Sequence, residues 1–273
     1  MSGGLAGDCD AGSQRSRSPR EEGEPLLPAF YRLLRHRRLG STNDEAKALA
    51  VSGAGEGTLV WALEQSKGHG RQGRPWASPP GNLYASIILK PQVSPARAAQ
   101  LGFAAALAVG EACLEAASGA AVGFKWPNDV LLAGRKLGGI LLESQMSGEG
   151  QVDWLVLGIG INLATYPVAT DYPATALSAC GVEVVPAAML SALARHFLAW
   201  YGRWDKGEGF AAVRAAWLER ATGLGGGLRV RLPRDTLMGI FAGLDVDGAL
   251  LLDAASGRRR IEAGEVFPAA PVS

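Results

Sequence analysis

The spacing of apolar and polar residues predicts both helices and strands along most of the chain. Alternating apolar and basic positions suggest a short helix at 26–38, and further helices are predicted at 42–51, 95–117, 187–204 and 209–221. Short apolar runs predict strands at 58–63, 83–89, 122–126, 130–132, 136–145 and 152–162. Residues 1–25 are rich in Gly, Ser, Arg and Glu, so we expect a disordered tail there.

Polar residues mark the ends of several of these elements. Either Ser41 with Asp44 or Thr42 with Glu45 has the three-residue spacing of a helix capping box. The most apolar long stretch, Leu101 to Phe124, carries Glu111 and Glu115 on one helical face. This pattern favours a buried amphipathic helix over a membrane span.

The character of the chain changes after residue 222. Residues 222–227 read Thr-Gly-Leu-Gly-Gly-Gly, which is typical of a linker. Short strands separated by Asp-Gly and Ser-Gly turns follow at 228–232, 236–244, 249–253 and 258–262. The sequence therefore predicts an α+β unit over 26–222 and a small β-barrel over 223–273.

Composition limits the classes of function. The chain has 273 residues, 48% of them hydrophobic, and a formal net charge of +1, which argues against a broad nucleic-acid surface. Its three cysteines are widely spaced and show neither metal-ligand nor disulfide patterns. The N-terminus has no apolar signal region, so we expect a cytoplasmic protein without a membrane anchor.

Residues 68–76 form the segment richest in chemistry, with three glycines, two arginines, a histidine and a tryptophan. Glycine admits close backbone approach, arginine pairs with carboxylate and phosphate, and tryptophan offers a stacking face. The segment also fits G-x-G-x-x-G, but Pro75 and Pro79 exclude the long helix that a dinucleotide site requires. We therefore expect a strand, a loop and a second strand.

The glycine-rich loop of protein kinases also lies between two strands, but the H-R-D and D-F-G elements of kinases are absent from this sequence. The alternative interpretation of residues 68–76 is a basic loop that is simply exposed to solvent.

A second polar motif, Lys-Trp-Pro-Asn-Asp, occupies 125–129. The hairpin predicted after it brings Lys136 back near this turn, where its charge would neutralise a developing carboxylate or α-phosphate charge. An ordinary polar turn with a solvated lysine is the alternative.

Three shorter motifs are less specific. Ser-Thr-Asn at 41–43 suits a polar ligand head or a plain helix cap. The amide of Gln65 suits a urea-like group or a polar strand end. The glycines and Asn162 within 158–162 suit a ligand against the backbone or a tight packing point.

Taken together and in this order, the motifs resemble the bacterial biotin–protein ligases over roughly residues 38–268. The resemblance implies a class II synthetase-like, biotin–lipoate ligase catalytic domain, a mixed sheet with helices packed on it, followed by a small SH3-like barrel. It implies that biotin and ATP form biotinyl-5′-AMP with Mg²⁺ assisting. It further implies transfer of biotin to a lysine of the biotin carboxyl carrier domain of acetyl-CoA carboxylase. The Mg²⁺ is expected on the ATP phosphates, with no protein ligand assigned.

The resemblance also implies roles for single residues. Arg71, Lys136 and Asp129 are the expected catalytic residues, with Asp129 near the incoming lysine amine. The residues expected around biotin are Ser41, Thr42, Asn43, Gln65, Gly68, His69, Gly70, Arg71, Lys136, Gly138, Gly158 and Gly160. Those expected to bind ATP and the adenylate are Arg71, Arg74, Trp76, Lys125, Asn128, Lys136 and Asn162.

Two departures from the family pattern bear on function. His69 stands where the family loop often has arginine, which weakens one cationic contact. Only about 38 residues precede the catalytic core, so we expect neither the family's DNA-binding domain nor repressor activity. The alternatives are a lipoate or octanoyl ligase or transferase of the same fold and a non-catalytic biotinyl-adenylate sensor. We expect a monomer or a weak homodimer.

Overall fold

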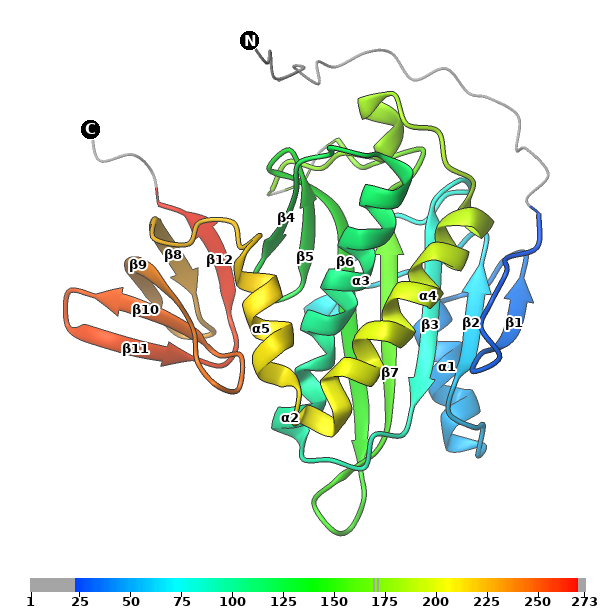
Figure 1. Ribbon diagram of the computed structural model, residues 1–273, viewed down its shortest axis with the longest axis horizontal. Helices are drawn as coiled ribbons and strands as arrows, with labels where there is room; N and C mark the ends of the chain where they lie inside the picture. Colours follow the sequence, from blue (N-terminus) through cyan, green and yellow to red (C-terminus); the bar gives the residue numbers. More distant parts are fainter. Residues whose placement is uncertain (1–22, 169, 171, 270–273) are drawn as a thin grey trace.

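The computed structural model describes residues 23–168, 170 and 172–269, so most of the tail predicted at 1–25 lies outside the described residues. Its centre is a seven-stranded mixed sheet in the order β1-β2-β3-β7-β6-β5-β4 (Figure 1). The strands are β1 Arg32–His36, β2 Thr58–Ala62, β3 Leu83–Leu89, β4 Val122–Lys125, β5 Asp129–Leu132, β6 Arg135–Met146 and β7 Val152–Ile161. β1 pairs with β2 in parallel, and every other pair is antiparallel.

Helices cover both faces of this sheet. Those on one face are α2 Pro95–Ala99, α3 Leu101–Ala116, α4 Pro186–Trp204 and α5 Phe210–Leu218, with α1 Thr42–Val51 on the opposite face (Figure 1). Single 3₁₀ turns lie at η1 Arg71–Gly73, η2 Leu177–Cys180 and η3 Asp205–Gly207. The arrangement confirms the predicted sheet with helices packed on it.

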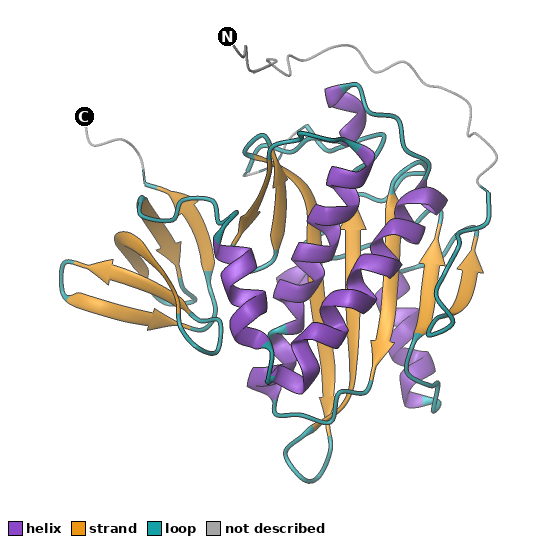
Figure 2. Ribbon diagram, viewed as in Figure 1, coloured by secondary structure: helices purple, strands orange, loops and turns teal. Residues whose placement is uncertain are grey.

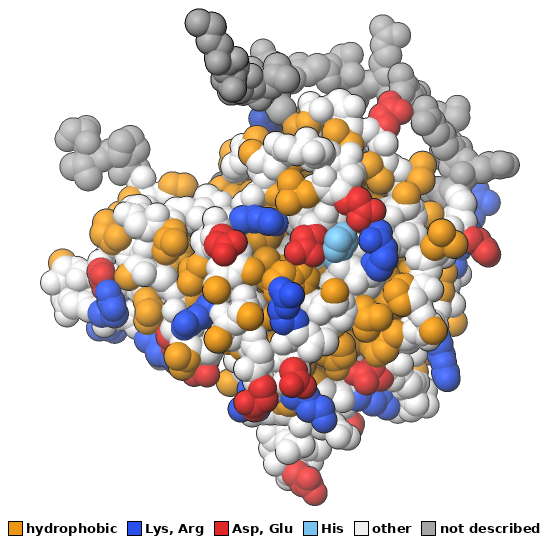
Figure 3. Space-filling view, viewed as in Figure 1, with side chains coloured by type: hydrophobic (Ala, Val, Ile, Leu, Met, Phe, Trp, Pro, Cys, Tyr) orange, Lys and Arg blue, Asp and Glu red, His pale blue; other side chains and the backbone are white. Residues whose placement is uncertain are grey.

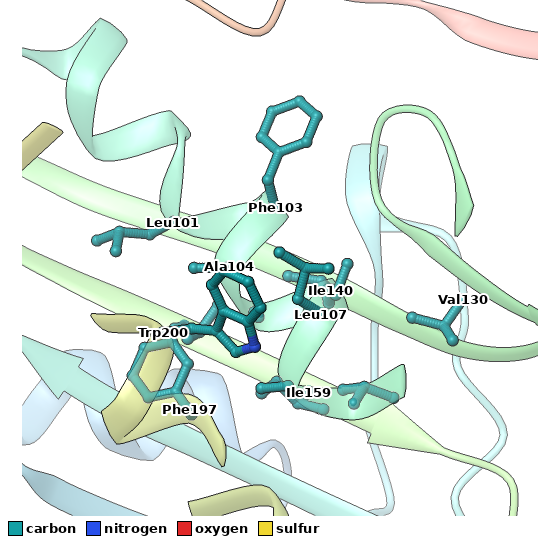
Figure 4. Packing of buried hydrophobic residues seen from close by; sticks show 14 of the residues in the cluster. Leu101, Phe103, Ala104, Leu107, Val130, Ile140, Ile159, Phe197 and Trp200 are labelled. Atoms are coloured by element: carbon teal, nitrogen blue, oxygen red, sulfur yellow. The ribbon is translucent and has the colours of Figure 1, made fainter. Parts of the chain in front are cut away.

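The main core lies between the sheet and the α3–α4 layer. Leu101, Ala104 and Leu107 of α3 pack near Ile140 of β6 and Trp200 of α4 (Figure 4). The segment Pro95–Ala116 is long and apolar enough to span a membrane, but 78% of its most apolar window is buried inside the protein. Its longer part, α3, is therefore a buried core helix, as the sequence pattern predicted. The face of the molecule that carries α3 and α4 shows acidic and basic side chains interspersed (Figure 3).

The described residues after α5 form strands and loops (Figure 2). They make a five-stranded antiparallel sheet in the order β11-β10-β9-β8-β12. The strands are β8 Gly227–Arg231, β9 Thr236–Leu244, β10 Leu250–Ala254, β11 Gly257–Ile261 and β12 Glu265–Pro268. Trp126 Nε1 donates to the carbonyl of Gly248 at 3.2 Å, which fastens this small sheet to the larger unit.

Three details differ from the sequence prediction. The helix predicted at 26–38 is wrong, because residues 32–36 form β1 and pair with all five residues of β2. Long-range pairing at the sheet edge overrides local helical spacing there. The helix predicted at 95–117 divides at Gln100, whose side chain accepts a hydrogen bond from Trp204 Nε1 at 2.9 Å. Strand β12 was not predicted; it pairs with β8, far from it in sequence.

Candidate active site

A cavity of about 430 Å³ opens between the 68–76 loop, the middle of the large sheet and strand β12. It gathers most of the residues that the sequence singled out. The predicted residues that line it are Ser41, Thr42, Asn43, Gln65, His69, Gly70, Arg71, Arg74, Trp76, Lys125, Asn128, Asp129, Lys136, Gly158, Gly160 and Asn162. Gly68 and Gly138 are not part of the lining.

The start of α1 forms one wall. Ser41 is the N-cap, and its hydroxyl accepts from the backbone N–H of Asp44 at 3.4 Å, as the capping spacing predicted. Gln65 Oε1 accepts from both the backbone N–H (2.7 Å) and the hydroxyl (3.0 Å) of Thr42. Asn43 Nδ2 donates to Glu143 at 2.8 Å, and its Oδ1 accepts from Ser86 at 2.6 Å. These side chains are therefore fixed before any ligand arrives.

The 68–76 loop folds back on itself as a hairpin. The N–H of Gly70 donates to the carbonyl of Arg74 at 2.8 Å, and that of Trp76 to the carbonyl of Gly68 at 2.9 Å. Gln72 at its tip has φ 58°, next to Gly73 at φ 70°. The strand-loop-strand interpretation is confirmed, because β2 and β3 on either side pair antiparallel.

Two arginines tie this loop to the small sheet. Arg71 Nη1 donates to Asn128 Oδ1 at 3.4 Å and to the carbonyl of Gly264 at 3.5 Å. Arg74 forms an ion pair with Glu265. Burial lowers the pKa of Arg71, against the opposing pull of Asp129. The cavity is thus closed on one side by contacts between distant parts of the chain.

Asp129 is a buried carboxylate held between two lysines. Its Oδ1 lies 2.6 Å from Lys136 Nζ and its Oδ2 lies 2.9 Å from Lys125 Nζ. Burial works against ionisation of Asp129, but the two ammonium groups outweigh it and hold the carboxyl pKa below its ordinary value. The predicted return of Lys136 to the 125–129 turn is confirmed by the pairing of β5 with β6.

The glycines make room for protein side chains. A Cβ on Gly158 would lie 2.0 Å from Asn43 Oδ1, and one on Gly160 would lie 2.7 Å from Trp76 Nε1. A Cβ on Gly138 would meet the carbonyl of Gly160 at 2.9 Å. Gly138 therefore permits close packing of neighbouring strands beneath the cavity. The lack of a side chain at Gly158 leaves space for the Asn43 amide, and the lack of one at Gly160 leaves space for the Trp76 ring.

Trp76 and Asn162 have different surroundings. The Trp76 ring lies 5.5 Å from Lys136 Nζ, and its Nε1 is buried without a hydrogen-bond partner among the described residues. Asn162 is 3% exposed, and its Nδ2 donates to the carbonyl of Thr175 at 3.0 Å. The Asn162 amide nitrogen is therefore engaged by the backbone, while the Trp76 ring nitrogen is buried against Gly160.

His69 points toward carboxylates at the rim. Its Nε2 lies 3.8 Å from Glu143 Oε2 and 4.0 Å from Asp44 Oδ1. Both carboxylates also pair with Lys47, at 2.8 and 2.9 Å. The loop histidine thus faces Asp44 in the first turn of α1 and Glu143 of β6.

Tyr172, Glu265 and Phe267 are among the lining residues that sequence reasoning missed. Tyr172 carries Lys125 Nζ 4.8 Å above its ring, and Glu265 and Phe267 come from β12. Tyr172 lies in an irregular segment with no periodic pattern. The other two reach the cavity through docking of the small sheet, which local sequence does not report.

Comparison with known proteins places the chain in a family. Residues 36–162 match the biotin/lipoate A/B protein ligase family, and residues 224–267 match the biotin protein ligase C-terminal domain. The chain is 44% identical over 237 residues to the biotin–[acetyl-CoA-carboxylase] ligase of Paracoccus denitrificans, covering 84% of this chain and 98% of that protein. The chain belongs to the biotin protein ligases. The resemblance drawn from the motifs is confirmed.

Other biotin protein ligases share the sequence and the fold. The bifunctional ligase/repressor BirA of Bacillus subtilis is 36% identical over 86% of this chain and 73% of its own length. The Aquifex aeolicus biotin protein ligase in complex with biotin and ATP superposes with a TM-score of 0.74 at 27% identity, over 87% of this chain and 98% of that one. The cavity described above is thus the candidate active site of a biotin ligase.

Proposed function

We propose that this cavity binds biotin and ATP side by side and joins them as biotinyl-5′-AMP. The enzyme is a biotin–[acetyl-CoA-carboxylase] ligase, consistent with its family and its 44% identity to the Paracoccus enzyme. The observation that carries the site assignment is the convergence of Lys136, Arg71, Trp76 and the Thr42–Gln65 pair on one cavity. We assign the remaining roles as the motifs predicted.

Charge in the cavity suits the union of two anions. Two acidic side chains, Asp129 and Glu265, line the cavity together with four basic ones, which are Arg71, Arg74, Lys125 and Lys136. A biotin carboxylate must approach the α-phosphate of ATP, so cations fixed at that point lower the barrier. In this proposal the Lys136 ammonium and the Arg71 guanidinium stabilise the charge on the reacting oxygens.

The opposite wall suits the neutral head of biotin. Thr42, Asn43 and Gln65 offer amide and hydroxyl groups that are already oriented by their own hydrogen bonds. A urea group needs both donors and acceptors, and a preorganised wall reduces the entropic cost of binding it. At the other end, Trp76 and Asn162 would flank adenine, and Lys125 and Asn128 would lie near the nucleotide.

Asp129 serves the second step in this proposal. An acceptor lysine attacks the mixed anhydride as a neutral amine, which forms a bond to the carbonyl carbon and expels AMP. A carboxylate held ionised between Lys125 and Lys136 can accept a hydrogen bond from that amine and stabilise the positive charge that develops on its nitrogen, and the released proton passes to water. The acceptor is a lysine of a biotin carboxyl carrier domain.

The residues present fit a Mg²⁺ that arrives with ATP. Groups of three or more His, Cys, Asp or Glu that could hold a metal ion are absent from the described residues. The ion would supply charge neutralisation on the phosphates, with the carboxylates of Asp129 and Glu265 nearby on the cavity wall. We further propose that the enzyme acts in the cytoplasm.

Incubation of the protein with ATP, Mg²⁺, biotin and a biotin carrier domain tests the proposal. We expect a mass increase of one biotinyl group on one carrier lysine and the appearance of AMP. Isothermal titration against biotin and against lipoate separates the alternatives. Lipoate binding without biotin binding would show a lipoate ligase, and biotin binding without AMP formation would show a sensor.

A further inference from the structure

A chain of hydrogen bonds connects the Gln65 amide to the backbone of Trp76. Gln65 Nε2 donates to Ser78 Oγ at 2.9 Å, and Ser78 Oγ donates to the carbonyl of Trp76 at 2.8 Å. Gln65 and Trp76 line the cavity, whereas Ser78 is 6% exposed and stands behind it. Ser78 therefore contacts both Gln65, which we assign to biotin, and Trp76, which we assign to the nucleotide, without lining the cavity itself.

Backbone groups at both ends fix the direction of every bond in this chain. The Thr42 N–H can only donate, so the Gln65 atom 2.7 Å from it is the amide oxygen. The amide nitrogen then faces Ser78 Oγ and donates to it. The Ser78 proton is left for the Trp76 carbonyl, which can only accept. The orientation of the Gln65 amide is thus tied to a hydroxyl thirteen residues away.

This orientation matters for recognition. Gln65 Oε1 is already occupied by two donors from Thr42. The amide nitrogen carries two hydrogens, and Ser78 takes one of them, so the second can donate to the carbonyl oxygen of a urea group. A reversed amide would place an acceptor there instead and would repel that oxygen.

Gly68 shows that the chain is tightly packed. A Cβ on Gly68 would lie 2.4 Å from Ser78 Oγ, 2.6 Å from the Trp76 carbonyl oxygen and 2.9 Å from Gln65 Nε2. All three members of the chain occupy the space that any side chain at position 68 would need. Any side chain at position 68 would therefore disrupt the two hydrogen bonds that join Gln65, Ser78 and Trp76.

We propose that Ser78 is a positioning residue that orients Gln65 for the biotin head group and couples it to Trp76. The inference rests on the biotin site proposed above. It explains why two ligand-binding residues on separate sides of the cavity share one buried hydroxyl. Removal of that hydroxyl weakens biotin binding through Gln65 and ATP binding through Trp76.

Isothermal titration of biotin and of a non-hydrolysable ATP analogue tests the proposal. Ser78→Ala leaves one buried donor and one buried acceptor unpaired, so we expect biotin affinity to fall roughly 5- to 100-fold, with a smaller fall for the nucleotide. Ser78→Thr keeps the hydroxyl and restores most of the affinity. Ser191→Ala, which removes a hydroxyl bonded to the Ala187 carbonyl on α4, leaves both affinities unchanged.

A double substitution separates positioning from general support. If Ser78 acts through Gln65, biotin affinity of Ser78→Ala/Gln65→Ala equals that of Gln65→Ala alone. Additive losses overturn the proposal. If Ser78→Ala does not fold, Gly68→Ala replaces it, because it forces the same three groups apart and keeps the hydroxyl; unchanged biotin affinity there also overturns it. A wild-type protein that binds no biotin contradicts the proposed function, whereas a binding wild type with an equally tight Ser78→Ala contradicts only the role of Ser78.

Discussion

The ammonium group of Lys136 lies 2.6 Å from Oδ1 of Asp129. The lysine that we assign to the reacting carboxylate is therefore held on its strand by a buried carboxylate that also binds Lys125. This pairing places a positive charge at the cavity wall with little freedom to move, as electrostatic stabilisation requires.

Lys136→Ala should slow adenylate formation by roughly 10²–10³-fold, the effect of removing one preorganised charge-stabilising group. Biotin-dependent exchange of pyrophosphate into ATP measures this step. Lys90→Ala is the matched control, since Lys90 follows β3 at the end away from the cavity. An unchanged exchange rate in Lys136→Ala would refute the assigned role.

Asp129 should make stability depend on pH. Its folded pKa is lowered, so its stabilisation is complete above the unfolded value of about 3.9 and is lost as the pH falls through the folded pKa. Asp129→Asn should lower the free energy of unfolding at neutral pH by about 1–3 kcal/mol, because two half-buried lysines lose their partner. The difference from wild type should shrink as the pH falls below about 4. Urea unfolding measures it, with the exposed Asp153→Asn as control; a difference independent of pH would contradict the assignment.

Substitutions at two glycines should affect biotin binding and ATP binding separately. Gly158→Ala must displace the Asn43 amide and should weaken biotin binding, whereas Gly160→Ala must displace the Trp76 ring and should weaken ATP binding. Overpacking of about 1–3 kcal/mol corresponds to about 5- to 100-fold in affinity. Gly148→Ala is the control, because nothing lies within 4 Å of its added Cβ. Equal losses of both ligands in both variants would show that the two sides are not separate.

Arg71→Gly should release the adenylate early. The substitution removes the contacts that join the loop to Asn128 and Gly264. Free biotinyl-adenylate reacts with any exposed amine, so lysines on a bystander protein should become biotinylated. Streptavidin blotting of added albumin measures this bystander biotinylation. If Arg71→Gly gives no more of it than wild type, another residue retains the intermediate.

His69→Arg should close the loop more firmly. An arginine fork carries a permanent charge and can pair with Glu143 and Asp44, whose carboxylate oxygens lie 3.8 and 4.0 Å from His69 Nε2. Dissociation of the adenylate, followed by stopped-flow fluorescence, should therefore be slower in His69→Arg than in wild type. Faster dissociation in the variant would show that the histidine is itself the better contact.

Much of the fold and of the site could be read from the sequence because their signals are local. The apolar runs at residues 83–89 and 152–162, the cap at Ser41 and the hairpin that returns Lys136 to Asp129 depend on neighbours a few residues apart. The motif order then predicted the family and most of the cavity lining. The interpretation of 26–38 as a helix was wrong because β1 is decided by its pairing with β2.

Only the tertiary structure decided which side chains support the ligand-binding residues. It placed Asn43 in the space above Gly158, joined Arg74 to Glu265, and connected Gln65 through Ser78 to Trp76. Each of these contacts depends on the path of the backbone between its partners, which no local periodicity encodes. The sequence thus determined which chemistry the chain carries, and packing across the cavity determined how each group is oriented, because a hydrogen bond or a steric contact is set by distances of a few tenths of an ångström.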